Sequence, residues 1–385
     1  MKIGFLTTYF YPFTGGAESN IYNLAKELVK NSHEVHVFTS DRKEKKRLKR
    51  EEVQEGIQIH RARTIFRYKY YFVWNPSLLS KILKTDLDIL HVNSLGFLWH
   101  DIIVLLKKAT SKTKIVNTPH GPFMALPEYK FHQKIIKKII TAIERPINKQ
   151  YDLVIQVNPN QKKWMKKIGI KEEKIRYLPN GIEKDFLKEP TEKEKKEFLR
   201  KYNIENKFIV SYLGRIQRYK GNHQVIEALK GIKGNITFLM MGADLEGEKK
   251  RLEEQAKKTN VNLKLIEEIS EKEKKIALAT SEIFILPSQW EAFGIVLLEA
   301  MAQRNAIIST TTEGANFLIK KENGCLFEYN DIPTLRNHLI KLIKNKNKRK
   351  QMQKNNRKKA KRFIWDKITK RLERIYKEKK KINNF

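Results

Sequence analysis

The feature that most constrains the fold of this chain is an alternation of short apolar runs with longer amphipathic segments. In the first half, the predicted strands are residues 2–8, 34–39, 88–92, 114–118, 153–157 and 175–178. Residues 17–30 follow the first run and place Ile21, Leu24 and Leu28 on one helical face. Strand, helix and strand at this spacing are typical of βαβ units, and therefore of a parallel sheet.

The same alternation starts again after a charged, proline-interrupted stretch at residues 189–201. The predicted strands of the second half are residues 208–213, 237–241, 262–266, 283–286 and 306–309. We therefore expect an α/β protein with two doubly wound, Rossmann-like parallel-sheet domains, at 1–188 and 189–362, that face a cleft. Open parallel sheets bind ligands at the carboxyl ends of their strands, and pockets often lie between domains.

Composition excludes several classes of protein. Hydrophobic residues make up 40% of the 385 residues, which is enough to build packed cores and argues against a disordered chain. Cys325 is the single cysteine, so a disulfide within the chain is excluded. No apolar stretch reaches the ~18 residues that a membrane-spanning helix needs. The first residues, MKIGFLTTYF, lack a signal-peptide cleavage site. We expect a cytoplasmic protein.

The net charge of +36 is unevenly distributed. Residues 341–385 hold 20 lysines and arginines against 3 acidic residues, and further basic runs lie at 42–50 and 134–145. Such runs attract phosphate-bearing partners, although a lysine-rich composition throughout the chain is the alternative explanation. Nucleic-acid binding is the less favoured partner class, because no recognised motif is present. In 134–145, isoleucines share one broad face, which indicates either an anionic membrane surface or a core-facing helix.

Two stretches of the first half place chemically useful groups at predicted strand ends. Gly15 and Gly16 lie between the first strand and the first helix, where bare backbone and a helix start can approach a phosphate or a sugar. The alternative is a βα turn that only requires glycine. His120, in the stretch 118–122, is placed to project from a strand end; a structural histidine is the alternative.

Two stretches of the second half carry charges after predicted strands. Arg215 and Lys220 come from one strand-end loop, and together they can neutralise a diphosphate. In 291–299, Glu291 is expected in a loop and Glu299 on the following helix, where carboxylates can accept hydrogen bonds from hydroxyl groups. The alternative is that acidic residues merely favour a helix N-terminus.

Metal-ligand patterns are weak. Asp86 and Asp88 have a D-x-D spacing, but Asp88 directly precedes a predicted strand. His33 and His36 are expected on opposite faces of a strand start. We expect no metal site.

Taken together, these stretches resemble the family 4 glycosyltransferases of the GT-B architecture. The matching segments run in the family's order at 15–28, 33–40, 118–121, 179–187, 214–221, 288–302 and 323–331. The chain departs from the family pattern at Ser32, where glycine is frequent, and at 304–306, where a Gly-Pro-Val turn is usual. Residues 41–80 match nothing that can be assigned.

The resemblance implies roles for residues that bind the donor. Arg215 and Lys220 match the pair on the donor diphosphate. Glu291 matches the carboxylate on the hydroxyls of the donor sugar, and Glu299 matches the one on the ribose. The base of the donor nucleotide is expected to be recognised by the backbone near Glu268 and Ile269. The side chains therefore do not distinguish a uracil donor from a guanine donor.

The resemblance also implies roles for backbone groups and for the first domain. Gly15 and Gly16 match the loop that approaches the donor phosphate and the acceptor, and His120 matches a histidine near the transferred sugar. Phe293 and Gly294 match backbone amides near sugar and phosphate. The family's last helix, here 363–376, crosses back, so 363–385 is expected to pack on the N-terminal domain.

The expected function is therefore that of a retaining enzyme without cofactor or metal. It would move a hexose from a UDP- or GDP-sugar to a hydroxyl of a glycan or lipid-linked acceptor in surface glycan or glycoconjugate synthesis. The basic runs raise the hypothesis of peripheral association with the cytoplasmic face of a membrane. The same fold with epimerase or phosphorylase chemistry is the alternative.

Overall fold

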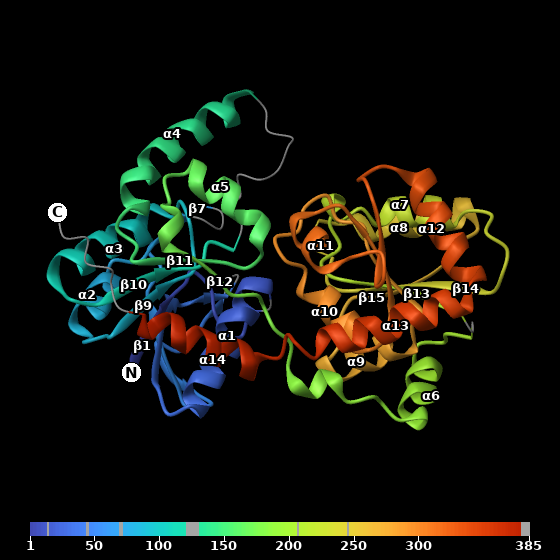
Figure 1. Cartoon of the computed structure of the whole chain (residues 1–385), viewed down its shortest axis with the longest axis horizontal. Helices are drawn as coiled ribbons and strands as arrows, with labels where there is room; N and C mark the ends of the chain where they lie inside the picture. Colours follow the sequence, from blue (N-terminus) through green and yellow to red (C-terminus); the bar gives the residue numbers. More distant parts are fainter. Residues whose placement is uncertain are drawn as a thin grey trace. The chain divides into compact units, whose positions relative to one another are not determined.

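The computed structural model describes residues 1–13, 15–43, 46–68, 72–120, 131–205, 208–244 and 246–378. The chain forms two compact units: unit 1 comprises Met1–Asn180 with Trp365–Phe385, and unit 2 comprises Gly181–Ile364 (Figure 1). The sequence predicts boundaries after residues 188 and 362, and the assignment of the units to acceptor and donor stays a prediction. Parts of three predicted segments lie outside the described residues, namely residues 44 and 45 of the basic run, residues 121 and 122, and residues 379–385 of the tail.

Unit 1 is built on an eight-stranded sheet with the strand order β12-β11-β10-β9-β1-β2-β6-β5. The bounds are β1 (Lys2–Leu6), β2 (Glu34–Ser40), β5 (Glu51–Gln54), β6 (Ile57–Ala62), β9 (Ile89–Val92), β10 (Lys114–Asn117), β11 (Leu153–Gln156) and β12 (Ile175–Tyr177). Neighbouring strands run parallel except for β5, which is antiparallel to β6. After β6 the chain crosses β1 and continues with β9, so the topological switch point lies between β1 and β9.

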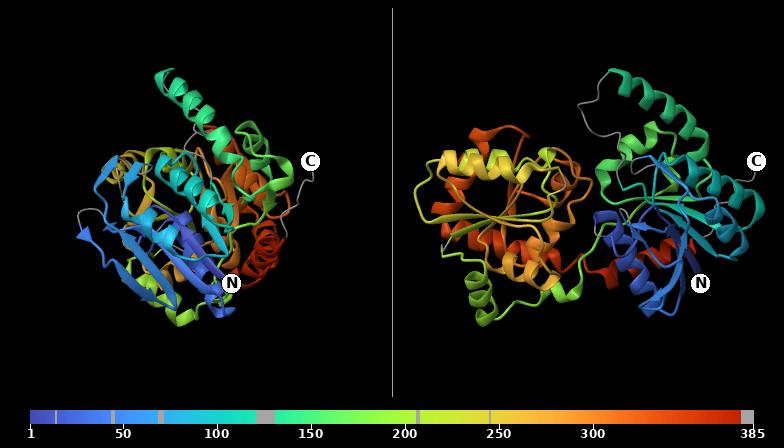
Figure 2. Two further views of the ribbon diagram at one scale, coloured as in Figure 1. Left: turned by 90° about the vertical axis from the view of Figure 1, so that its left-hand side faces the viewer. Right: turned by 180° about the vertical axis from the view of Figure 1, so that it is seen from behind.

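Helices cover both faces of this sheet. The bounds are α1 (Gly16–Lys30), α2 (Ser77–Lys84), α3 (Leu98–Thr110), α4 (Phe131–Asn148), α5 (Lys162–Lys167) and α14 (Trp365–Lys377). One core joins strand residues such as Phe5 and Val37 to α1 and α14, while a second joins the sheet to α2, α3 and α5. Helix α14 packs beside α1 and buries Ile368, Leu372 and Ile375 at helical spacing (Figure 2). The C-terminal helix therefore crosses back to the N-terminal unit, as the sequence predicts.

Residues 51–74 form strands that the sequence did not reveal. Strands β5 and β6 are joined by Glu55 and Gly56, whose φ angles of 48° and 79° are both positive, as in a type I′ hairpin turn. Two shorter antiparallel pairs, one before and one after this hairpin in the sequence, form separate two-stranded sheets. Their bounds are β3 (Arg42–Lys43) with β4 (Lys46–Arg47), and β7 (Phe66–Tyr68) with β8 (Phe72–Trp74).

Unit 2 contains a six-stranded parallel sheet with the order β15-β14-β13-β16-β17-β18. The bounds are β13 (Phe208–Leu213), β14 (Ile236–Met241), β15 (Asn262–Ile266), β16 (Ile283–Leu286), β17 (Ala306–Thr310) and β18 (Gly324–Phe327). In chain order this is 3-2-1-4-5-6, the doubly wound Rossmann arrangement, with its switch point between β13 and β16. The predicted fold class is confirmed.

The helices of unit 2 connect these strands (Figure 1). Their bounds are α6 (Glu192–Lys201), α7 (Asn222–Leu229), α8 (Glu248–Thr259), α9 (Glu271–Thr280), α10 (Ile295–Ala302), α11 (Glu313–Leu318), α12 (Ile332–Lys344) and α13 (Lys346–Ala360). Helix α9 begins with a capping box, in which Ser270 and Glu273 satisfy each other's backbone amides. Among the described residues, every helix is too short or too polar to cross a bilayer.

Candidate functional site

The loop after β13 holds Arg215 against the end of the sheet. The Gly214 amide donates to the Met241 carbonyl at 2.9 Å, and the next strand approaches so closely that a Cβ on Gly242 would lie 2.1 Å from the Gly214 oxygen. The Tyr212 hydroxyl donates to the Arg215 carbonyl at 2.8 Å. The Arg215 side chain is exposed, and its guanidinium makes no hydrogen bond or ion pair with the part of the chain that the structure describes. The backbone of Arg215 is therefore held at the switch point, and its guanidinium has no counter-charge among the described residues.

Lys220 and Glu291 meet between the loops that follow β13 and β16. Their Nζ and Oε1 atoms are 2.5 Å apart, and the two side chains are only 11% and 17% exposed. The Ser288 hydroxyl donates to the same carboxylate oxygen at 3.1 Å. Burial lowers the pKa of Lys220, but the Glu291 carboxylate and two tyrosines outweigh it, so the net shift is upward. Lys220 is therefore protonated at neutral pH, and the sequence did not predict its contact with Glu291.

The backbone around Glu291 is held from the next loop. The Gly314 amide donates to the Glu291 carbonyl at 3.1 Å, and a Cβ on Gly314 would lie 2.3 Å from the Phe293 carbonyl oxygen. Gly294, with φ of 77°, directly precedes α10. Phe293 is buried. Glu291 thus lies in a loop before this helix and Glu299 lies on it, as the sequence predicts.

Glu299 pairs with Lys274, a residue that the sequence analysis did not single out. Lys274 Nζ is 2.9 Å from Glu299 Oε1 and 2.6 Å from Glu271 Oε2. Burial lowers the pKa of Lys274, but Glu299 and then Glu271 outweigh it, so the net shift is upward. In the sequence, Lys274 belongs to a run of charges that resembles a solvated helix start. Glu268 and Ile269 follow β15, and no hydrogen bond or ion pair among described residues joins them to Glu299.

The other predicted residues follow β1 and β10, two strands that both neighbour β9 in the sheet of unit 1. Gly16 begins α1 and Gly15 precedes it in extended conformation. His120 follows β10 with φ of 52°, and its Nε2 lies 3.2 Å from Asn93 Oδ1, beyond the end of β9. Burial lowers the pKa of His120 to about 4, so the imidazole is neutral at physiological pH. The left-handed region is uncommon for a residue other than glycine, so the backbone at this strand end has a specific conformation.

His91, a fully buried histidine on β9, lies near His120. His91 Nδ1 is 2.6 Å from the Tyr376 hydroxyl of α14, and Nε2 is 2.7 Å from Thr118 Oγ1. Burial, with a smaller effect from His120, lowers the pKa of His91 to about 3. The crossover helix therefore connects to the strand end that carries His120.

Two carboxyl groups meet between α3 and α4. Asp101 and Glu144 are 2% and 5% exposed. Burial, followed by the neighbouring Glu144, raises the pKa of Asp101 well above its ordinary value, and burial also raises that of Glu144. We infer that the pair holds a proton at neutral pH, since two adjacent buried carboxylates repel each other.

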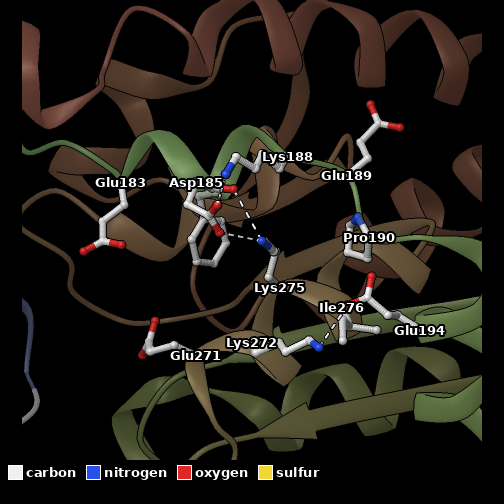
Figure 3. Close-up of a pocket in the computed structure, with 11 residues that line it drawn as sticks. Glu183, Asp185, Lys188, Glu189, Pro190, Glu194, Glu271, Lys272, Lys275 and Ile276 are labelled. Atoms are coloured by element: carbon white, nitrogen blue, oxygen red, sulfur yellow. Dashed lines mark hydrogen bonds and ion pairs between the residues drawn. The ribbon is translucent and has the colours of Figure 1, made fainter.

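Unit 2 also contains a pocket of about 450 Å³ (Figure 3). Its lining consists of Glu183, Asp185, Phe186, Lys188, Glu189, Pro190, Glu194, Glu271, Lys272, Lys275 and Ile276. Lys275 and Asp185 are 2.6 Å apart, and Lys272 and Glu194 are 3.0 Å apart. None of the predicted site residues lines this pocket. No group of three potential metal ligands occurs among the described residues.

Comparison with protein families matches the two halves of the chain in succession. Residues 14–186 match the model described as Glycosyltransferase Family 4, and residues 194–359 match Glycosyl transferases group 1. N-acetyl-alpha-D-glucosaminyl L-malate synthase of Bacillus anthracis is 26% identical over 397 residues, which cover 98% of this chain and 96% of the relative.

Solved structures share the fold at low sequence identity. Sucrose-phosphate synthase from Thermosynechococcus elongatus has a TM-score of 0.81 and 20% identity, and the match covers 97% of this chain and 98% of that one. Anabaena Alr3699/HepE in complex with UDP-glucose has a TM-score of 0.77 and 18% identity, with the same coverages of 97% and 98%.

Proposed function

Because the chain belongs to the family 4 glycosyltransferases and acts on nucleotide sugars, we propose that it transfers a hexose from a UDP- or GDP-sugar to a hydroxyl acceptor with retention of configuration. The observation that carries this proposal is the pairing of Lys220 with Glu291 at the switch point of unit 2, beside the exposed Arg215. Two cations and a carboxylate at one sheet edge suit a sugar joined to a diphosphate.

Arg215 and Lys220 stabilise the leaving diphosphate in this mechanism. Negative charge develops on the phosphate as the bond to the sugar breaks, and cations that are already in place stabilise it without reorganisation. Removal of one such preorganised group typically costs about 2.7–4 kcal/mol of transition-state stabilisation. Because the chain itself supplies these charges, we expect the reaction to proceed without a metal ion.

Glu291 binds the sugar in this mechanism and does not attack it. Its Oε1 already accepts from Lys220 and Ser288, so the carboxylate is a stabilised, weak nucleophile. The other oxygen remains available to accept a hydrogen bond from a sugar hydroxyl. Retention then follows from attack of the acceptor on the donor's own face, with a phosphate oxygen taking the proton. Glu299, held by Lys274, accepts from the ribose hydroxyls.

The surface of unit 1 supports a lipid-linked or membrane-bound acceptor. On α4, Ile135, Ile139 and Ile143 are 44%, 55% and 51% exposed at intervals of four residues, so they form one apolar stripe. Lys138 and Arg145 are exposed on the same helix, which projects from unit 1 (Figure 2). An apolar stripe with flanking cations suits the interface of an anionic bilayer. We infer peripheral binding at this helix.

Flotation with vesicles tests the membrane part of the proposal. We expect the protein to float with vesicles rich in phosphatidylglycerol at low salt, and to remain behind with phosphatidylcholine vesicles or at high salt. Ile139→Asp places a carboxylate in the stripe and is expected to abolish flotation. Absence of binding to anionic vesicles at low salt would contradict the assignment.

Calorimetric titration with UDP, GDP, ADP and dTDP in the presence of a chelator tests the donor site. One diphosphate is expected to bind with micromolar affinity, Arg215→Ala is expected to lose it, and Arg218→Ala, in the same loop, serves as the matched control. Equal binding by Arg215→Ala would refute the phosphate assignment. Mass spectrometry of incubations with the selected sugar nucleotide then distinguishes glycosyl transfer from release of free sugar or sugar phosphate, which epimerase or phosphorylase chemistry would give.

A further inference from the structure

The side-chain amide of Asn93 has a defined orientation. Asn93 is 7% exposed and lies just beyond the end of β9. Its Nδ2 donates to the His91 carbonyl at 3.2 Å, and a carbonyl oxygen can only accept. The nitrogen of the amide is therefore turned toward the β9 backbone, and the Oδ1 oxygen is turned toward His120 Nε2, at 3.2 Å.

This orientation determines which nitrogen of His120 carries the proton. The Oδ1 atom of an asparagine has no proton to donate, so a hydrogen bond to His120 requires a proton on Nε2. A neutral imidazole has one N–H, and burial keeps His120 neutral by lowering its pKa to about 4. The Nδ1 atom therefore carries a bare lone pair. It makes no hydrogen bond with any residue that the structure describes.

The surroundings of His120 favour this neutral form. His91, on β9, is an ionisable neighbour of His120, and it is itself neutral because burial lowers its pKa to about 3. Both nitrogens of His91 are already engaged, with Tyr376 of α14 and with Thr118 beyond β10. No carboxylate among the described residues forms an ion pair with His120, so a protonated imidazolium would have no counter-charge.

We propose that Asn93 is a positioning residue that fixes His120 as the Nε2–H tautomer, so that the bare Nδ1 accepts a hydrogen bond from a substrate hydroxyl. The inference rests on the proposed function, in which His120 contacts the transferred sugar. The reverse tautomer would present an N–H in place of the lone pair. An imidazolium would place a positive charge near the sugar ring as that ring itself becomes positively charged.

Nitrogen NMR of the full-length protein with ¹⁵N-labelled histidine reads the tautomer directly. The chain has nine histidines, and the His120→Gln spectrum identifies the missing pair of signals. At pH 7 we expect a protonated Nε2 and an unprotonated Nδ1. Asn93→Leu removes the acceptor at similar volume, and we expect the two tautomers to interconvert in that variant. An Nδ1–H tautomer in the native protein, or an unchanged tautomer in Asn93→Leu, would overturn the proposal.

Asn93→Asp should change the pKa of His120, which a purely structural role of Asn93 would leave unchanged. The new carboxylate still accepts from Nε2–H, but it stabilises the imidazolium and should raise the pKa of His120 by ~2 units. The neutral fraction of His120 would then rise about fourfold between pH 5.5 and pH 8, whereas the native protein stays neutral over this range. Asn148→Asp, at another buried asparagine of unit 1, is the matched control. A His120 titration unchanged by Asn93→Asp would overturn the proposal.

Binding measurements separate failure of this inference from failure of the proposed function. UDP and UDP-glucose, or GDP and GDP-mannose if the calorimetric screen selects guanine, are titrated into the native protein and Asn93→Leu. We expect Asn93→Leu to bind the diphosphate normally and the sugar nucleotide roughly tenfold more weakly, since one hydrogen bond to the sugar is lost. Equal weakening of both ligands, or of neither, contradicts the role of Asn93. Loss of diphosphate binding in the native protein would instead refute the proposed function.

Discussion

The partly buried pair of Lys274 and Glu299 should be energetically coupled. At 2.9 Å and an effective dielectric of about 20, the attraction between the two charges is ~6 kcal/mol before desolvation is subtracted. The side chains are 13% and 12% exposed, so removal of Lys274 leaves the Glu299 carboxylate with little solvent and without its counter-charge, whereas removal of Glu299 leaves Lys274 paired with Glu271. Such a loss typically costs about 3–5 kcal/mol, and because both heads retain some solvent we expect about 3 kcal/mol for Lys274→Met.

A double-mutant cycle isolates this coupling. Lys274→Met, Glu299→Gln and the double variant are unfolded in urea, and the unfolding of unit 2 is followed. We expect a coupling energy of about 2 kcal/mol, so the double variant should be more stable than the two single losses imply. Lys201 and Glu273, 2.6 Å apart but with Lys201 62% exposed, form a matched control pair, for which we expect less than about 1 kcal/mol. Additivity within about 0.5 kcal/mol at Lys274 and Glu299 would refute the reasoning.

Three further predictions concern the two units. Because the pKa of Asp101 is raised, the contribution of this residue to stability is fully present below the ordinary pKa of ~4 and is lost as the pH rises towards the folded-state pKa. Asp101→Asn should therefore flatten the decline in melting temperature between pH 5 and pH 8. An unchanged slope would contradict the shared proton. Gly242 has a φ of 135°, and a Cβ at this position would lie 2.1 Å from the Gly214 oxygen. Gly242→Ala should therefore displace the loop that carries Arg215, and the diphosphate affinity measured by calorimetry should fall at least tenfold. An affinity equal to that of the native protein would show that the position of this loop is unimportant. Leu372→Ala, fully buried in α14, should destabilise unit 1 by ~3 kcal/mol in urea unfolding, whereas no loss would mean that the crossover helix contributes little to that core.

Most strands of the two sheets could be predicted because buried parallel strands are short, continuous apolar runs. The strand 208–213 is an example, since its bounds agree with the structure. The hairpin at 51–62 lacks that signal, because its turn residues are Glu55 and Gly56 rather than the familiar Asn-Gly or Asp-Gly. Strand β18 was also not predicted, because GCLF is too short and too weakly apolar to register as a run.

Residue types at the candidate site could be inferred from the sequence, but their pairings could not. Arg215, Lys220 and Glu291 stand out because charges follow apolar strands. The contact between Lys220 and Glu291 depends on β13 and β16 being neighbours, which is a property of the sheet order. Lys274 and Asn93 gave no signal at all, since each acts through a partner distant in sequence.

The return of α14 to unit 1 affects how the chain matures during synthesis. Unit 2 is a continuous segment, Gly181–Ile364, and all of it leaves the ribosome before α14 emerges. The core beneath α1 includes Ile368, Leu372 and Ile375, so this core remains incomplete until α14 is translated. Domains generally fold from the N-terminus onward during translation. Here we expect the reverse order, with nascent unit 1 exposing apolar surface after unit 2 has folded, and hence a particular need for chaperones.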